Sequence, residues 1–358
     1  MDQERQLRRG WTTGACATAA ATAAYHALLT GIFPDPVAIL LPGGQKPAFA
    51  LAFQAMAPGV ATAGIVKDAG DDPDVTHGVL VKATVTPGEA GRGLVFRAGE
   101  GVGTVTLPGL PLDPGEPAIN PVPRRMIGAA IAALAAAHGA SGDVVVEIAI
   151  PGGEAIARKT LNPRLGILGG LSILGTTGVV VPYSCAAWIH SIHRGIDVAR
   201  AAGISHVAGA TGSVSEAAVA KLYALPERAL IDMGDFVGGM LKYLKVRPLP
   251  RVTIAGGFAK MTKLGQGLLD LHSKRGEVDL PWLATRVRAA GGDEALAARV
   301  ATANTALAAL RLCRAEDVPI GEEVARAAKA TAAAVLAAAP VEVDIAIFDR
   351  DGHLVARA

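Results

Sequence analysis

Between residues 206 and 257, three apolar segments alternate with two helical segments, and this series constrains the fold more than any other feature of the chain. The apolar segments 206–211, 229–233 and 251–255 are predicted strands, and 215–225 and 235–245 are predicted helices. Strands that are joined by helices lie parallel in one sheet. Helices then dominate from 282 to 338, and 341–348 and 353–356 form a predicted terminal hairpin. The sequence therefore predicts a parallel-sheet α/β domain over residues 163–358.

The first half of the chain has a different order of elements. An alanine-rich helix is predicted from residue 12 to about 29, with a threonine as its cap and Gly31 at its end. Further predicted elements are strands at 37–41, 49–53, 79–86 and 144–150, a helix at 124–137, and a strand at 155–160 that pairs with 144–150. These elements predict an α+β domain over residues 1–162. Segments 12–53 and 124–160 share the order helix, strand, Pro-Gly-Gly turn, strand, which duplication and convergent turn chemistry explain equally well.

Composition limits the classes of partner and the compartment. The formal net charge is +2, which predicts no strong attraction to nucleic acid or to a membrane surface. The three cysteines lie far apart without a CxxC pair, so we expect no disulfide framework and a cytoplasmic, reducing location. Arg8 and Arg9 before an alanine-rich stretch resemble a twin-arginine export signal, but threonines interrupt the stretch and we interpret it as a structural helix.

Glycines and polar residues follow each of the three predicted parallel strands. Ligands of an open parallel sheet bind beyond the carboxyl ends of its strands, where glycines let a ligand approach the backbone. The residues expected to bind a cofactor there are Thr211, Gly212, Ser213, Gly234, Asp235, Gly256 and Gly257. Ordinary turns and helix caps are the alternative interpretation of each turn. The glycine-rich segment 165–178 is either a neutral wall for a flat ring or a buried turn.

The acidic loop 67–78 contains four aspartates and one histidine within ten residues. The spacing does not match an EF-hand, and we expect a rigid loop that presents a proton acceptor, with Asp71 and His77 as the catalytic candidates. A solvated, capped turn is the alternative. Cys185, His190 and His193 lack a carboxylate at matching spacing, so no metal site is predicted there.

Two basic pairs lie where cations oppose the dipole of a predicted helix. Arg124 and Arg125 follow a proline at the start of one helix, and Lys260 and Lys263 lie at the start of the helix after the third strand. A multiply anionic substrate would compensate for this cost, so all four are substrate-binding candidates. Simple placement on the surface is the alternative.

Several motifs together resemble one known family. The segments are Arg9-Gly10-Trp11-Thr12-Thr13-Gly14-x-Cys16, the acidic loop 67–78, the glycine-rich segment 165–178 and Asp270-Leu271-His272-Ser273. They resemble the CbiD family of cobalt-precorrin-5B C-1-methyltransferases over the whole chain. Trp11 stands where that family more often has tyrosine or phenylalanine, and an aromatic ring is kept.

The resemblance implies transfer of a methyl group from S-adenosyl-L-methionine to ring carbon C-1 of a corrinoid, giving cobalt-precorrin-6A on the route to cobalamin. It implies two domains, an N-terminal α+β domain on the substrate side and a Rossmann-like parallel-sheet domain. Within the N-terminal signature, Thr12 and Thr13 are expected to bind substrate. The many carboxylates of a corrinoid suit the basic pairs. An enzyme that holds the reacting carbon and the methyl group at near-attack distance can lower the activation barrier by several kcal/mol.

Two other functions remain open from the residues alone. One is a nucleotide-dependent enzyme of another class, such as a dehydrogenase with an unusual glycine loop, although neither GxGxxG nor a Walker motif is present. The other is a non-enzymatic corrinoid carrier, which would not need a second, cofactor-like domain. The expected partner is a small, multiply anionic corrinoid, with no nucleic acid and no membrane. The helices of 282–338 are compatible with a homo-oligomer but do not require one.

Overall fold

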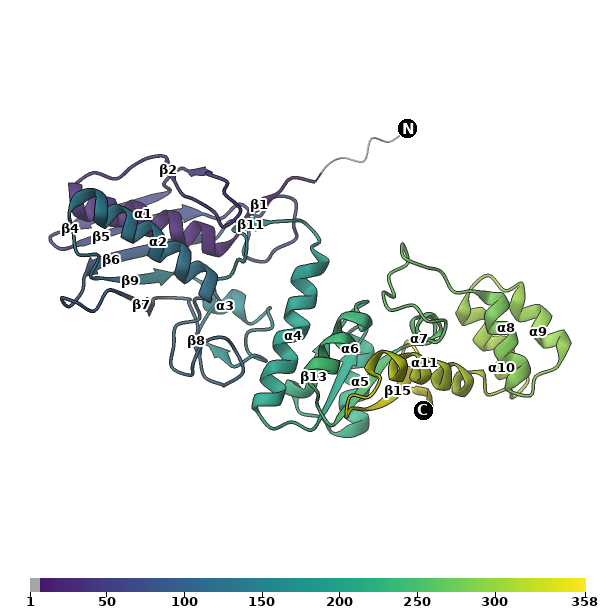
Figure 1. Cartoon of the computed structure of the whole chain (residues 1–358). Coiled ribbons are helices and arrows are strands. Elements are labelled where there is room, and N and C mark those ends of the chain that lie inside the picture. Colours follow the sequence, from purple (N-terminus) through teal and green to yellow (C-terminus); the bar gives the residue numbers. More distant parts are fainter. Residues whose placement is uncertain (1–6) are drawn as a thin grey trace, which may run out of the picture. The chain divides into compact units, whose positions relative to one another are not determined.

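The chain divides into two compact units, Met1–Cys185 and Ala186–Ala358, and the computed structural model describes residues 7–358 (Figure 1). This division falls later than the predicted boundary after residue 162. Strands β10 (Ile167–Leu168) and β11 (Val179–Val180) pair with β8 (Thr104–Val105) and β1 (Gly10–Trp11). These pairings hold the segment 163–185 in the first unit. Each unit combines helices with a mixed sheet, which confirms the mixed α/β class.

A five-stranded sheet in the order β4-β5-β6-β9-β7 is the centre of the first unit. The strands are β4 (Phe53–Ala57), β5 (Val60–Val66), β6 (Leu80–Pro87), β9 (Val144–Ala149) and β7 (Leu94–Ala98). Neighbours are antiparallel except β7 and β9, which are parallel. Before these strands in the chain, β2 (Val37–Ala38) and β3 (Ala48–Phe49) form a separate antiparallel pair. Both are shorter than the predicted strands 37–41 and 49–53.

Two long helices pack together in this unit. Helix α1 (Thr13–Thr30) begins after Thr12, whose hydroxyl accepts the N–H of Ala15, and ends at Gly31 with φ 81°, as the sequence predicts. Its alanines are all buried, so the helix backbone lies close to β5, β6 and α2 (Pro121–His138) (Figure 1). The small side chains of α1 therefore allow close packing of the helix against the sheet and against α2.

The predicted strand at 155–160 is wrong. Residues Gly153–Ala157 form the short helix α3 instead. Strand β9 already has neighbours on both sides, because β7 from an earlier part of the chain pairs with it in parallel. A hairpin partner after the Pro-Gly-Gly turn therefore has no free edge, and the proposed repeat of local topology fails at this point.

The second unit contains the predicted parallel strands in the order β13-β12-β14-β15-β16. The strands are β12 (His206–Ala210), β13 (Leu230–Asp232), β14 (Arg251–Gly257), β15 (Glu342–Phe348) and β16 (Leu354–Arg357). The first four pair in parallel with one another, and β16 closes the predicted terminal hairpin by pairing antiparallel with β15. Both predictions are confirmed.

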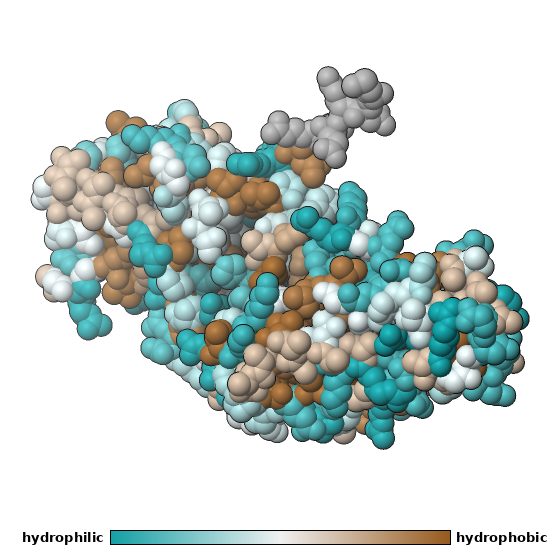
Figure 2. Space-filling view, turned by 45° about the vertical axis from the view of Figure 1, so that its right-hand side comes forward, coloured by the Kyte–Doolittle hydropathy of each residue, from teal (hydrophilic) through white to brown (hydrophobic). Residues whose placement is uncertain are grey.

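Helices connect and follow these strands. They are α4 (Cys185–Ala201), α5 (Ser213–Tyr223), α6 (Val237–Val246), α7 (Phe258–Gly265), α8 (Leu280–Ala289), α9 (Glu294–Ala301), α10 (Ala306–Ala315) and α11 (Ile320–Leu336), with a short 3-10 turn η1 at Glu227–Ala229. Helix α11 packs on α6, α7 and β15, and the core there includes Met240, Ile254 and Val324. Among residues 7–358, no helix combines the length and the apolar character needed to cross a bilayer. On the face shown in Figure 2, small apolar patches lie among hydrophilic side chains.

Candidate functional site

The ends of three parallel strands lie side by side in the second unit. Ala210 is in register with Asp232 on one side and with Ala255 on the other. Hydrogen bonds continue into the turns that follow the strands, since the N–H of Thr211 donates to the carbonyl of Ala255 at 3.0 Å. On the other side, the N–H of Gly234 donates to the carbonyl of Ala210 at 3.1 Å. The predicted cofactor residues 211–213, 234–235 and 256–257 therefore form one group, here called the strand-end cluster.

The glycines of the strand-end cluster have two different roles. A Cβ atom on Gly256 would lie 2.8 Å from the Thr211 hydroxyl oxygen, so this glycine permits close packing between neighbouring turns. A Cβ atom on Gly212 or Gly257 would meet no atom within 4 Å. These two exposed residues precede helices α5 and α7, and in the described structure neither helix has a side-chain cap. Backbone N–H groups at two helix starts are therefore accessible to a bound molecule.

Lys260 lies within the strand-end cluster. Its Nζ atom is 2.9 Å from Oδ1 of Asp235 and donates to the carbonyl of Thr211 at 3.2 Å. The Asp235 side chain is 22% exposed, and its Oδ1 atom is buried without a hydrogen bond of acceptable geometry among the described residues. Oδ1 therefore faces the Lys260 ammonium and is closed to solvent, and the exposed part of the Asp235 side chain is what a ligand can reach. The sequence assigned Lys260 to the substrate, but the structure places it with the predicted cofactor residues.

Lys263 does not belong with Lys260 at a helix start. It lies in the last turn of α7, where a cation favours the helix dipole, and it is only 9% exposed. Its Nζ atom donates to the carbonyl of Leu271 at 3.2 Å. The structure therefore separates Lys263 from the helix start at which the sequence placed it with Lys260, and one donor of its ammonium group serves the backbone of a neighbouring loop.

The segment 269–272 borders the strand-end cluster, and reasoning from strand ends alone missed it. The N–H of Leu271 donates to the carbonyl of Asp235 at 2.9 Å, and the N–H of Gly238 donates to the carbonyl of Leu269 at 2.8 Å. The available signal was the Asp270-Leu271-His272-Ser273 motif. It could not be placed from the sequence because it lies beyond the last strand of the series.

A second cluster forms in the first unit from three motifs that are distant in sequence. The N–H of Trp11 donates to the carbonyl of Asp68, and the N–H of Thr12 donates to the carbonyl of Gly178. A Cβ atom on Gly10 would overlap the backbone of Ala69. We call residues 8–14, 67–78 and 174–183 the N-terminal motif cluster. The signature, the acidic loop and the end of the glycine-rich segment thus form one structure.

The hydroxyls of Thr12 and Thr13 are used inside this cluster. Thr12 caps α1, and Thr13 accepts the N–H of Leu174 at 2.9 Å. Thr13 is buried, with 5% of its surface exposed. Both threonines hold the start of α1 in place, and neither hydroxyl is directed to a bound substrate by these contacts.

The two catalytic candidates lie in the acidic loop and both are exposed. Asp71 accepts the backbone N–H of Arg8 through Oδ2 at 2.7 Å, while its own N–H donates to the carbonyl of Arg8. His77 accepts the N–H of Ala69 through Nδ1 at 3.1 Å. A neutral imidazole that accepts at Nδ1 carries its proton on Nε2, so His77 presents a donor and not an acceptor. Of the two candidates, Asp71 is the one whose geometry suits proton acceptance.

Other aspartates of the loop are held by cations and backbone N–H groups. Hydrogen bonds from Arg8 and from the N–H of Gly70 lower the pKa of Asp68 to about 2. Burial by itself raises the pKa of Asp74, but hydrogen bonds from Lys67 and Thr76 outweigh it and the pKa is lowered. The buried Lys67 ammonium lies 2.6 Å from Asp74. Ion pairs and hydrogen bonds therefore connect both ends of the loop to neighbouring residues, which is compatible with the predicted rigid loop.

The glycine-rich segment and Arg124 serve internal packing. A Cβ atom on Gly170 or Gly175 would overlap the backbone of Gly101 or the side chain of Thr12, which supports the buried-turn interpretation of 165–178. Arg124 donates to the carbonyls of Ile119 and Pro117 and pairs with Glu116 at 2.7 Å. Its guanidinium holds the loop before α2, whereas the side chain of Arg125 is exposed.

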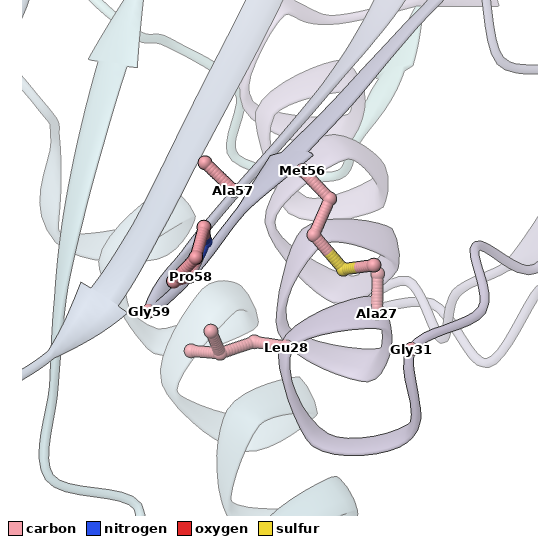
Figure 3. A pocket seen from close by; sticks show the side chains of 7 residues that line it. All are labelled: Ala27, Leu28, Gly31, Met56, Ala57, Pro58 and Gly59. Atoms are coloured by element: carbon pink, nitrogen blue, oxygen red, sulfur yellow. The ribbon is translucent and has the colours of Figure 1, made fainter.

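Two further features lie apart from these clusters. A hollow of about 380 Å³ at the end of α1 is lined by Ala27, Leu28, Gly31, Met56, Ala57, Pro58 and Gly59 (Figure 3). It contains none of the predicted site residues. Among residues 7–358, the group whose donor atoms lie close enough to share a metal ion is Asp349, Asp351 and His353, in the turn of the terminal hairpin. In α4, His193 stacks on Tyr243 with ring centroids 3.9 Å apart.

The fold and the strand-end cluster define a mixed α/β protein whose parallel sheet presents glycine-lined turns at one edge. The sequence pattern of the CbiD family matches residues 1–182, and that of the CbiD C-terminal domain matches residues 270–358. The chain therefore belongs to the CbiD family, which confirms the resemblance found in the sequence.

Curated relatives match over almost the whole chain. A protein of Bradyrhizobium sp. (strain BTAi1) is 67% identical, with coverage of 99% of this chain and 94% of the relative. A protein of Paramagnetospirillum magneticum is 63% identical, with both chains covered completely. Both are named cobalt-precorrin-5B C(1)-methyltransferase. A crystal structure of the cobalamin biosynthesis protein CbiD from Archaeoglobus fulgidus is 28% identical, with a TM-score of 0.41, and covers 75% of this chain and 83% of that chain.

Proposed function

We propose that this chain methylates ring carbon C-1 of cobalt-precorrin-5B to give cobalt-precorrin-6A, with S-adenosyl-L-methionine as the methyl donor. The observation that carries the proposal is full-length identity of 63–67% to two proteins that have this enzyme name. Identity at this level extends over both units and so includes both clusters. The enzyme then acts in cobalamin synthesis, and its free cysteines Cys16, Cys185 and Cys313 are consistent with the cytoplasm.

The strand-end cluster is the proposed donor site. The strand order β13-β12-β14 with parallel pairing supports a Rossmann-like description of the second unit, in which ligands bind at the carboxyl ends of the strands. The open backbone at Gly212 and Gly257 and the exposed part of the Asp235 carboxylate fit a molecule with hydroxyl and ammonium donors. Asp235 is proposed to accept hydrogen bonds from such donors. Thr211 and Ser213 line the same turn.

The reaction needs a donor and an acceptor carbon in line. S-adenosylmethionine, when bound, supplies the methyl group: the bond from sulfur to methyl breaks with its electron pair on sulfur, and a carbon–carbon bond forms with a pair from the macrocycle. The protein contributes mainly positioning, which can lower the barrier by several kcal/mol. The Lys260–Asp235 pair keeps the net charge of the donor site near zero, so a cationic sulfonium is neither strongly repelled nor strongly stabilised in the ground state.

The N-terminal motif cluster is the proposed substrate side. Only Oδ2 of Asp71 has a hydrogen bond among the described residues, so Oδ1 can accept a proton and help set the electron-rich form of the macrocycle. The exposed Arg9 and Arg125 are proposed to bind substrate carboxylates. Arg124, Thr12 and Thr13 act indirectly by holding the loops and the helix start on which these residues lie.

Binding calorimetry tests the donor class and separates the alternatives. The purified protein is titrated with S-adenosylmethionine, with S-adenosylhomocysteine and, for comparison, with NADH and NADPH. Binding of the first two alone supports the methyltransferase. Binding of a nicotinamide dinucleotide alone would assign the chain to another class of nucleotide-dependent enzyme. Binding of a corrinoid without any of these nucleotides would favour the carrier function.

A further inference from the structure

Trp188 is an exposed aromatic side chain that borders the strand-end cluster. It lies in the first turns of α4 and is 45% exposed. Its Nε1–H donates to the carbonyl of Asp232 at 3.1 Å. A Cβ atom on Gly234 would lie 3.3 Å from Cζ2 of the indole, so the ring lies directly against the backbone of this glycine. Trp188 thus contacts the end of β13 through one hydrogen bond and one surface contact.

These contacts fix the ring while leaving much of it exposed. The hydrogen bond to Asp232 restricts rotation of the indole, and Phe236 supports it with ring centroids 6.4 Å apart. Gly234 has φ 55°, a conformation that favours glycine, and the missing side chain leaves room for the ring. Aromatic side chains usually stabilise a fold by being buried, and the exposed part of this ring does not make that contribution. Its exposure suits the binding of a second flat ring.

Strand β13 is at the edge of its sheet, so no further strand lies beyond it on the side away from β12. Asp235 follows Gly234 directly, and the accessible turns at Gly212 and Gly257 belong to the same cluster. The carboxylate of Asp235 therefore lies one residue along the chain from the glycine against which Trp188 packs. A nucleoside combines a flat base with hydroxyl donors on an adjacent ribose, which matches this arrangement.

We propose that Trp188 is the stacking surface for the adenine ring of the methyl donor, with Asp235 accepting hydrogen bonds from the adjoining ribose. This inference rests on the proposed function and identifies which part of the donor lies at the edge of β13. The macrocycle of the substrate is also flat, but the carboxylates on its rim are hydrogen-bond acceptors and cannot donate to Asp235. The ribose hydroxyls beside adenine can.

The test is titration of S-adenosylhomocysteine into the full-length protein and its variants, followed by calorimetry and tryptophan fluorescence. Trp188→Ala should weaken binding about tenfold, the size expected for loss of one stacking contact between a base and an aromatic ring. Trp188→Phe keeps a ring and should retain most of the affinity. Trp282→Phe is the matched control, since Trp282 packs on Gly265 and Arg286 in another part of the unit.

Fluorescence adds a readout that a purely structural role of Trp188 would not change. Quenching by S-adenosylhomocysteine should persist in Trp282→Phe and disappear in Trp188→Phe, although the latter still binds the ligand. Adenosine should reproduce the dependence on Trp188, and homocysteine should not.

Three results would overturn the inference. If the wild-type protein binds S-adenosylhomocysteine and Trp188→Ala binds it equally well, the inference is wrong and the proposed function stands. If Trp188→Ala loses affinity for a corrinoid but not for adenosine, the ring belongs to the substrate side. If the wild-type protein binds no S-adenosylhomocysteine, the donor site of the proposed function fails together with the inference.

Discussion

Replacing Asp74 by asparagine should destabilise the first unit by about 3 kcal/mol. The Lys67 side chain is 1% exposed and its ammonium is 2.6 Å from Asp74. Asparagine keeps an acceptor for the N–H and hydroxyl of Thr76 but leaves the buried ammonium without a counter-charge. Removal of one partner from a buried ion pair costs about 3–5 kcal/mol. We expect the lower end, because the Asp74 side chain is 25% exposed and water reaches part of the site.

Urea denaturation followed by Trp11 fluorescence measures this change in the first unit. Trp11 belongs to the N-terminal motif cluster, and a background with Trp188→Phe and Trp282→Phe removes the emission of the second unit. A loss of about 3 kcal/mol corresponds to a decrease in the urea midpoint of roughly 1 M or more. Lys67→Met removes the buried charge itself, so the double variant Lys67→Met/Asp74→Asn should regain much of the loss.

The pH dependence provides a second check on the same pair. The pKa of Asp74 is lowered in the folded state, so its contribution to stability is complete above the usual pKa of about 4 for an unfolded aspartate. The contribution disappears as the pH falls through the lowered folded pKa. The difference in stability between the wild type and Asp74→Asn should therefore narrow in acid. An Asp74→Asn midpoint equal to that of the wild type at pH 7 would refute the reasoning.

Three further predictions concern the two clusters. Gly257→Ala should leave the urea midpoint nearly unchanged, because its Cβ meets no atom within 4 Å, yet it should weaken binding of S-adenosylhomocysteine in calorimetry by occupying the approach to the backbone. Asp235→Asn should weaken the same binding about tenfold, since hydrogen bonds to a charged acceptor contribute more than those to a neutral one; unchanged affinity would exclude Asp235 from the site. Arg8→Gln should raise the carboxyl pKa of Asp68 from about 2 toward its usual value in an NMR titration, since the Arg8 hydrogen bond is the largest cause of the lowering. That pair stabilises the wild type above about pH 4, and its contribution is lost as the pH falls through about 2.

Local rules predicted the elements whose neighbours are close in sequence. The Thr12 cap, the Gly31 end of α1 and the parallel strands β12, β13 and β14 all follow from capping chemistry and from alternation of apolar and helical segments. The hairpin of β15 and β16 follows in the same way. In each case the partner lies within one supersecondary unit, so periodicity contains the required information.

The errors occurred where a distant partner determined the structure. Residues 155–160 have the turn and the apolar character of a returning strand, but β7 already pairs with β9 and the segment forms α3. The hairpin of β4 and β5 was not predicted, because 49–53 was interpreted as the returning strand of an earlier pair. The domain boundary was placed too early, because β10 and β11 find their partners in β8 and β1.

In the candidate sites, too, features set by neighbours in sequence were predicted and features set by distant contacts were not. The strand-end cluster was predicted because parallel strands bring their carboxyl ends to one edge. The pairing of Lys260 with Asp235, the commitment of Lys263 to Leu271 and the position of Trp188 depend on side-chain directions and on a loop beyond the sheet. No spacing in the sequence encodes these contacts.

Transfer of an isotopically labelled methyl carbon tests the central claim most directly. The purified protein is incubated without oxygen with S-adenosylmethionine labelled in its methyl group and with cobalt-precorrin-5B, and the products are analysed by NMR and mass spectrometry. The account predicts one labelled methyl group at ring carbon C-1 and an equal amount of S-adenosylhomocysteine. Label at another ring position, or a bound but unmethylated substrate in the presence of intact donor, would contradict it.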